Sequence, residues 1–177
     1  MITLNEPRPV KNAKNAESFL NAEELLYARS NVIIRRSFLS DWFKLKKSDR
    51  LEVYLASGVN PSDALEKSLE ETLIGFTVLI NYKPEISFGI TAPCLMGNEA
   101  VIWMLSSDKI NDIGVRFIRN NRRYIDYFLT YYKRLVNYVH VDNTSSIKWL
   151  KYLGARFDEP LPYGIHNRMF MKFTFKR

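Results

Sequence analysis

Apolar side chains follow more than one spacing along this chain, and each spacing predicts a type of element. The short continuous run Val32 to Ile34 predicts a buried strand over residues 31–36. Phe38 to Leu45 follows, with two adjacent aromatic residues, and is predicted as a helix. Two further helices are predicted, from Asp49 to Ser57 with Gly58 as the stop, and from Asn60 through Thr72.

The apolar positions then alternate with a period of two, which is typical of strands. Strands are predicted over Leu73 to Ile80, Glu85 to Thr91 and Glu99 to Leu105, with a turn at Asn81 to Pro84 between the first two. These three strands form a predicted antiparallel meander. The inward-facing residues of its middle strand are Ile86, Phe88 and Ile90.

A long helical pattern from Asp112 to Tyr132 separates this meander from another apolar strand, Leu135 to Val141. A crossover helix of this kind joins parallel strands, so Leu135 to Val141 is predicted to lie parallel to Glu99 to Leu105. Ile165 to Phe175 is predicted as the final strand. The core face of the long helix is predicted to consist of Ile113, Phe117, Tyr124 and Phe128.

A capped helix is predicted between the last two strands. Asn143 can cap it, because its side chain can accept a hydrogen bond from a backbone amide. Ile147, Leu150 and Leu153 follow at helical spacing. Gly154 supplies the left-handed residue that ends the helix.

This helix and the order of the elements resemble the GNAT-like acyltransferase superfamily, whose last helix carries an Asn, an apolar face and a Leu-Gly-Phe ending. The resemblance implies an α/β (α+β) fold, with a mixed central sheet of about six or seven strands and helices on both faces. It covers residues 31–177 as one domain. Residues 1–30 are expected to form an N-terminal arm with a short amphipathic helix.

Two parts of the chain also resemble the small internal virion or head-assembly proteins of short-tailed bacteriophages. One is Leu45 to Leu69, which contains Asp49-Arg50-Leu51-Glu52. This resemblance implies a protein of the host cytoplasm, and then of the virion, with other virion or assembly proteins as partners. The second part is the series Asn137-Tyr138-Val139, Asn143, Ser146-Ile147, Trp149-Leu150 and Leu153-Gly154.

The composition fits a single soluble domain, since the 177 residues are 46% hydrophobic and 25% charged. No apolar run of about 18 residues is present and the first ten residues lack the order of a signal peptide, so we expect no membrane partner. The single cysteine, Cys94, excludes an internal disulfide. With His140 and His166 alone beside it, no metal site is expected.

Basic residues are concentrated in the C-terminal half, where residues 100–177 hold 14 Lys and Arg against 6 Asp and Glu. Arg116, Arg119 and Arg123 share one face of the predicted long helix, because they are spaced by three and four. Such a face could contact the phosphates of nucleic acid. The alternative is a solvated outer face.

Acyl transfer from acetyl coenzyme A would need free amides and spaced glycines at the junction of the third meander strand and the long helix. Residues 105–114 carry neither those glycines nor the Arg or Gln that leads the superfamily motif. Asp108 and Asp112 place negative charge there, and only Lys109 opposes them. If the cofactor binds, the candidate contacts are Leu105 and Ser106 through their main chain, Lys109, Asn143 and Ser146.

No catalytic residue is assigned. The tyrosine that the superfamily uses as a proton donor stands four residues before the glycine of the last helix, where this chain has Leu150. Tyr152 is displaced by about 200° around the helix and would point away. Glu85 and Glu99 at strand starts are candidate general bases, or simply solvent-facing strand ends.

Three functions are therefore weighed. The first is a phage virion or assembly protein that uses a degenerate GNAT-like fold for protein binding, with no cofactor. The second is an active N-acetyltransferase that uses acetyl coenzyme A. The third is a nucleic-acid-binding module that acts through the basic helix face.

Overall fold

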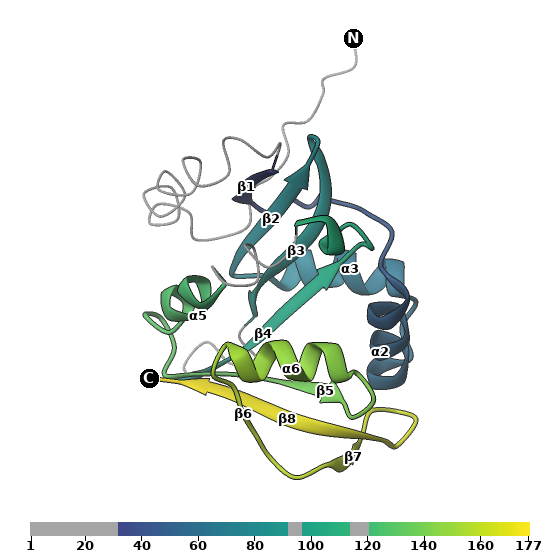
Figure 1. Cartoon of the computed structure of the whole chain (residues 1–177), viewed down its shortest axis with the longest axis vertical. Coiled ribbons are helices and arrows are strands. Elements are labelled where there is room, and N and C mark those ends of the chain that lie inside the picture. The colour runs from purple at the N-terminus through teal and green to yellow at the C-terminus, as the bar shows by residue number, and fades with distance from the viewer. Residues whose placement is uncertain (1–31, 92–96, 114–120) are drawn as a thin grey trace.

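A computed structural model describes residues 32–91, 97–113 and 121–177 of the chain. These residues form one mixed sheet with helices on both of its faces (Figure 1). The strand order is β1-β2-β3-β4-β5-β8-β6, with β7 paired to β8. The strands are β1 (Val32–Arg36), β2 (Ile74–Ile80), β3 (Lys83–Thr91), β4 (Glu99–Ser106), β5 (Arg134–His140), β6 (Arg156–Phe157), β7 (Leu161–Tyr163) and β8 (Arg168–Lys176). The helices are α2 (Lys47–Ser57), α3 (Pro61–Glu71), α5 (Arg122–Phe128) and α6 (Thr144–Tyr152).

The predicted meander is confirmed, since β2, β3 and β4 pair antiparallel in chain order, and β1 adds to the free edge of β2. The turn between β2 and β3 places Asn81 and Tyr82 at φ values of 50° and 64°, the geometry that a tight hairpin turn requires. Ile86, Phe88 and Ile90 are buried in the main core, as predicted. The sheet has eight strands because two short strands, β6 and β7, pair with β8. The sequence prediction lacked both.

Two apolar layers cover the sheet. On one face, Leu65 and Leu69 of α3 pack with Trp103 and Leu105 of β4. The opposite face carries the larger cluster, in which α5 and α6 cover the alternating apolar residues of the strands. In Figure 1, α6 crosses the near side of the sheet and α3 lies behind it. The predicted core residues Tyr124 and Phe128 of α5 are both buried in the larger cluster.

The predicted helix over Phe38 to Leu45 is wrong, because no helix forms there. The buried Asp41 carboxylate accepts hydrogen bonds from the Arg35 guanidinium and from the backbone N–H of Phe38, the latter at 2.8 Å, and so holds a turn. Beyond it the chain is extended. Phe43 and Leu45 are buried while Trp42 is 61% exposed, so the period here is two.

Several predictions fall wholly or partly outside the described residues. The N-terminal arm of residues 1–30 and Cys94 lie there. So do Phe117, Arg116 and Arg119 of the predicted long helix, of which the structure describes α5 at the C-terminal end. None of the helices in the described ranges is long and apolar enough to cross a membrane.

The capped helix predicted before the last strand is confirmed as α6. The Asn143 side chain accepts a hydrogen bond from the backbone N–H of Ser146 at 3.3 Å. Ile147, Leu150 and Leu153 are buried, and Gly154 has a φ of 88°. The helix therefore starts and ends where the sequence predicts.

Candidate functional site

Strands β4 and β5 run parallel, as predicted, but they separate after three residue pairs. Within these two strands the ladder joins Glu99 to Arg134, Ala100 to Leu135 and Val101 to Val136. In a continued parallel ladder the Ile102 carbonyl would accept from the Tyr138 amide. Instead the Asn137 side chain lies between them: its Nδ2 donates to Ile102 O at 2.7 Å, and its Oδ1 accepts from Tyr138 N at 2.8 Å.

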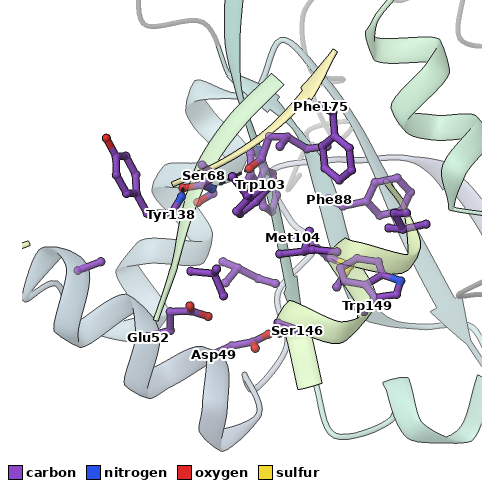
Figure 2. Close-up of a pocket in the computed structure, with 18 of the residues that line it drawn as sticks. Asp49, Glu52, Ser68, Phe88, Trp103, Met104, Tyr138, Ser146, Trp149 and Phe175 are labelled. Atoms are coloured by element: carbon purple, nitrogen blue, oxygen red, sulfur yellow. Dashed lines mark hydrogen bonds between the residues drawn. The ribbon is translucent and has the colours of Figure 1, made fainter. Parts of the chain in front are cut away.

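A cavity of about 290 Å³ lies where the two strands diverge. Residues 102–105 of β4 and residues 137–139 of β5 line it. Because successive side chains of a strand point to opposite faces of the sheet, the cavity runs through the sheet between the strands. Figure 2 shows Asp49 and Glu52 of α2 on one side of this cavity and Phe88, Trp149 and Phe175 on the other. Side chains from both faces of the sheet thus line one cavity.

Asp49 of α2 is bonded to the end of β4. Its Oδ2 accepts from the backbone N–H of Ser106 at 2.9 Å and from the Ser106 hydroxyl at 3.1 Å. Its Oδ1 lies 3.3 Å from the Lys46 ammonium. A buried carboxylate from the helix therefore satisfies the last backbone donor of the strand.

Glu52, one turn further along α2, is bonded to the end of β5. Its Oε1 accepts from the backbone N–H of His140 at 2.6 Å, and its Oε2 accepts from Asn143 Nδ2 at 2.8 Å. The two carboxylates of α2 thus hold the separated ends of β4 and β5. Asn143 serves both as the cap of α6 and as a partner of Glu52.

Burial raises the pKa of both carboxyl groups. For Asp49 the loss of hydration raises the pKa, and the Lys46 charge and the Ser106 hydrogen bonds oppose this change. For Glu52 the loss of hydration again dominates over the hydrogen bonds from His140 and Asn143, and the nearby Asp49 carboxylate raises the pKa further. A further negative charge on the α2 side of the cavity would therefore be unfavourable.

Five of the backbone amides that follow β4 in the described residues have partners within the chain. Ser107 N–H donates to the Glu85 carbonyl at 2.8 Å, and Lys109 N–H donates to the Ser107 hydroxyl at 3.1 Å. The amides of residues 110–112 donate to the carbonyls of residues 107–109. A polyphosphate binds such a junction through amides that point freely at it. These five amides are therefore not free to donate to a phosphate.

The residues predicted as cofactor contacts do not all lie together. Leu105 and Ser146 line the cavity. Ser106 is fully buried against Asp49, and Asn143 pairs with Glu52. Lys109 is exposed and pairs with Asp112 at 3.1 Å. Three of the five residues, Ser106, Asn143 and Lys109, are therefore paired with acidic side chains of the chain itself.

The residues that the sequence analysis discussed for catalysis lie at several separate positions. Leu150 lines the cavity where the superfamily has its tyrosine, and Tyr152 is 63% exposed. The Glu85 carboxylate accepts from the Ser107 hydroxyl. Glu99 lies 3.5 Å from Arg134, at the paired end of β4 and β5. Across the described ranges, no group of His, Cys, Asp and Glu side chains is arranged to hold a metal ion.

Polar residues of the cavity that sequence reasoning did not select as site residues include Asp49, Glu52, Asn121 and Asn137. Asn121 is buried and its Oδ1 has no hydrogen-bond partner among the described residues. The buried Nε1 of Trp149 likewise has none. A carboxylate in a helix normally faces solvent, so no local pattern in the sequence identifies Asp49 and Glu52 as lining residues.

Comparison with known proteins adds a family resemblance and a fold. Residues 87–161 match the family model described as "Bacteriophage T7, probable scaffold protein Gp13". No curated protein matches the sequence.

Among solved structures, the chain is similar to a GNAT-family acetyltransferase from Bacillus anthracis, with a TM-score of 0.57 and 13% identity over 82% of this chain and 95% of that one. It is similar to smu.2055 from Streptococcus mutans UA159, with a TM-score of 0.59 and 13% identity over 81% and 98%. It is also similar to a Bacillus subtilis acetyltransferase in complex with CoA, with a TM-score of 0.53 and 7% identity over 84% of this chain and 99% of that one.

The fold is therefore GNAT-like, as the order of elements predicted. The resemblance to a phage scaffold family is confirmed over residues 87–161.

Proposed function

We propose that this protein is a bacteriophage assembly protein that uses its GNAT-like fold to bind other assembly proteins, and that it does not transfer acyl groups. The match of residues 87–161 to the phage scaffold family supports the first part. The protein would act in the host cytoplasm and then in the virion. Its partners would be other virion or assembly proteins.

The observation that carries the second part is the bond between Asp49 and the backbone N–H of Ser106, at 2.9 Å. Coenzyme A is a polyanion, and an anion next to the carboxylates of Asp49 and Glu52 would be repelled in a poorly hydrated site. The amides of the following turn donate to groups of the chain itself. These features favour a binding protein over an acyltransferase.

Two measurements test the proposal. Mass spectrometry of purified virions and of assembly intermediates is expected to find the chain in at least one of them, and its absence from both would contradict the assembly role. Isothermal titration with acetyl coenzyme A is expected to give no heat at millimolar ligand, because the anion site is blocked. Binding of acetyl coenzyme A at micromolar concentration would contradict the proposal that the protein does not transfer acyl groups.

An active N-acetyltransferase is the alternative, and the cavity between β4 and β5 favours it, since an acyl donor needs such a space. Micromolar heat together with acetylation of an amine would support this alternative. For nucleic-acid binding, Arg116 and Arg119 lie outside the described residues. A charge-reversal variant of Arg116, Arg119 and Arg123 that leaves DNA binding unchanged would eliminate that role.

A further inference from the structure

We propose that two copies of this chain associate face to face, with the acidic helix α3 of each copy lying on a basic part of the sheet in the other copy. The two surfaces lie on the same side of the sheet, next to each other. The association of two copies goes beyond the assembly role proposed above and does not depend on it.

The outer side of α3 is acidic. Its exposed side chains include four carboxylates and one ammonium, a net charge of −3: Asp63, Glu66, Glu70, Glu71 and Lys67. Glu66 and Glu70 are one helical turn apart and repel each other. Glu70 and Glu71 add negative charge in the last turn of the helix, where the dipole is already negative and no basic residue stands. This arrangement is unfavourable in an isolated chain and would be relieved by a basic partner.

The basic part of the sheet is formed by β5, β6 and β8. Directly paired residues of neighbouring strands project from the same face, and so do alternate residues of one strand. By this rule four cations share one face: Arg134, Arg156, Lys172 and Lys176. Glu99, which is 3.5 Å from Arg134, and Asp158, whose N–H donates to the Lys172 carbonyl, oppose two of these charges and leave a net charge of +2. Arg134 and Lys176 are direct cross-strand partners, and such a like-charged pair is again unfavourable in an isolated chain.

The acidic helix and the basic surface form a step on one side of the sheet. Leu69 of α3 packs with Trp103 of β4, and Glu99 projects on the same side as Trp103 because an even number of residues separates them. Lys172 and Thr174 of β8 are partly exposed on this side, so none of the described helices closes over them. In Figure 1, α3 lies behind the sheet, and β6 and β8 lie at its lower end. Because a helix with its side chains is about 10 Å thick, α3 is a ridge beside open sheet.

A two-fold axis in the plane of this step brings unlike surfaces together. The rotation lays the ridge of each copy over the open sheet of the other, so the contact between opposite charges is made twice. The whole chain carries a net charge of +7, and most other orientations therefore set cations against cations. Charge and shape together favour a second copy in this orientation.

Sedimentation velocity of the full chain tests the association and its salt dependence. At an ionic strength of about 0.1 M, where the Debye length is about 10 Å, a dimer is expected at micromolar concentration. At about 1 M the Debye length falls to about 3 Å, and the dimer is expected to dissociate at least tenfold more readily. A wild-type chain that stays monomeric at the lower salt would overturn the proposal, and this is the result expected if the two surfaces bind other proteins instead.

Exchange of the charges tests the orientation. Glu66→Lys/Glu70→Lys on α3 and Arg156→Glu/Lys176→Glu on the sheet are each expected to weaken the dimer at least tenfold, because each variant sets like charges against each other in both contacts. An equal mixture of the two variants is expected to dimerise again. In the mixed pair one contact is native and the other has its signs exchanged.

Lys148→Glu/Lys151→Glu on the exposed side of α6 is the matched control, since it changes the net charge as much as Arg156→Glu/Lys176→Glu but on the other side of the sheet. It is not expected to weaken the dimer. Circular dichroism shows whether each variant is folded, and Glu66→Gln/Glu70→Gln replaces a reversed variant that is not. Variants that dimerise as strongly as the wild type, or a mixture of folded variants that stays monomeric, would overturn the proposal. If the chain is found in virions but is monomeric, this inference fails while the proposed function stands.

Discussion

The side chain of Asn137 donates to the carbonyl oxygen of Ile102 at 2.7 Å, in place of the main-chain bond that a parallel ladder would make there. The same carboxamide accepts from the amide of Tyr138 at 2.8 Å. One side chain therefore satisfies both strands at the point where they separate. The backbone groups at the point of separation, Ile102 O and Tyr138 N–H, are therefore both hydrogen-bonded, although β4 and β5 no longer pair there.

Replacing Asn137 with alanine leaves Ile102 O and Tyr138 N without their partner. The free energy of unfolding is expected to fall by about 1–3 kcal/mol, the cost of unsatisfied buried polar groups. Urea denaturation measures this change. Asn111→Ala, at an exposed position, is the control and should change stability little. An Asn137→Ala protein as stable as the control would show that the bridge is not needed.

Removal of the Glu52 side chain should be more damaging than removal of an exposed glutamate. Glu52→Ala leaves the amide of His140 and the side chain of Asn143 without their acceptor, so α2 loses its bond to β5 and α6. A loss of about 2 kcal/mol or more is expected, since bonds to a charged group are the stronger ones. Glu66→Ala on the exposed face of α3 is the matched control. Equal unfolding midpoints for the two variants would refute this role.

The raised pKa values of Asp49 and Glu52 predict a pH dependence with a definite sign. Between its ordinary pKa and its raised pKa, each carboxyl binds protons more strongly in the folded protein than in the unfolded chain. Their contribution to stability therefore falls as the pH rises through that interval, and is constant above it. Stability of the wild type minus that of Asp49→Asn/Glu52→Gln is expected to increase on acidification. Parallel urea-midpoint curves would contradict the burial of these charges.

Gly164 and Gly154 both have a positive φ, yet alanine should be tolerated less well at Gly164. A Cβ at Gly164 would lie 2.5 Å from the carbonyl oxygen of Ala56, which is backbone of α2. A Cβ at Gly154 would meet the end of the flexible Arg122 side chain, at 2.6 Å, which can move. Both variants carry about 1–2 kcal/mol of left-handed strain, and Gly164→Ala carries the clash in addition. Thermal unfolding of the two variants measures the difference, and equal losses would contradict the close packing.

The elements that the sequence predicts correctly are those with a strong local pattern. The β2 to β4 meander has a period of two and a turn at Asn81, and α6 has its cap at Asn143 and its stop at Gly154. The segment from Phe38 to Leu45 is not helical as predicted, because the ion pair between the half-buried Arg35 and the buried Asp41 overrides its local preference. Strands β6 and β7 were missed because they are too short to show a period and depend on pairing with β8.

The sequence by itself determined the order of the longer strands and of helices α2, α3 and α6, the parallel relation of β4 and β5, and the lack of a glycine-rich turn after β4. Each follows from spacing or composition along a short stretch. Only the tertiary structure decided that Asp49 reaches Ser106, 57 positions away, and that Glu52 reaches His140, 88 positions away. A helical carboxylate has the same local pattern whether it faces water or a strand end. Packing of α2 across the diverging strands therefore places these two carboxylates in the lining of the cavity.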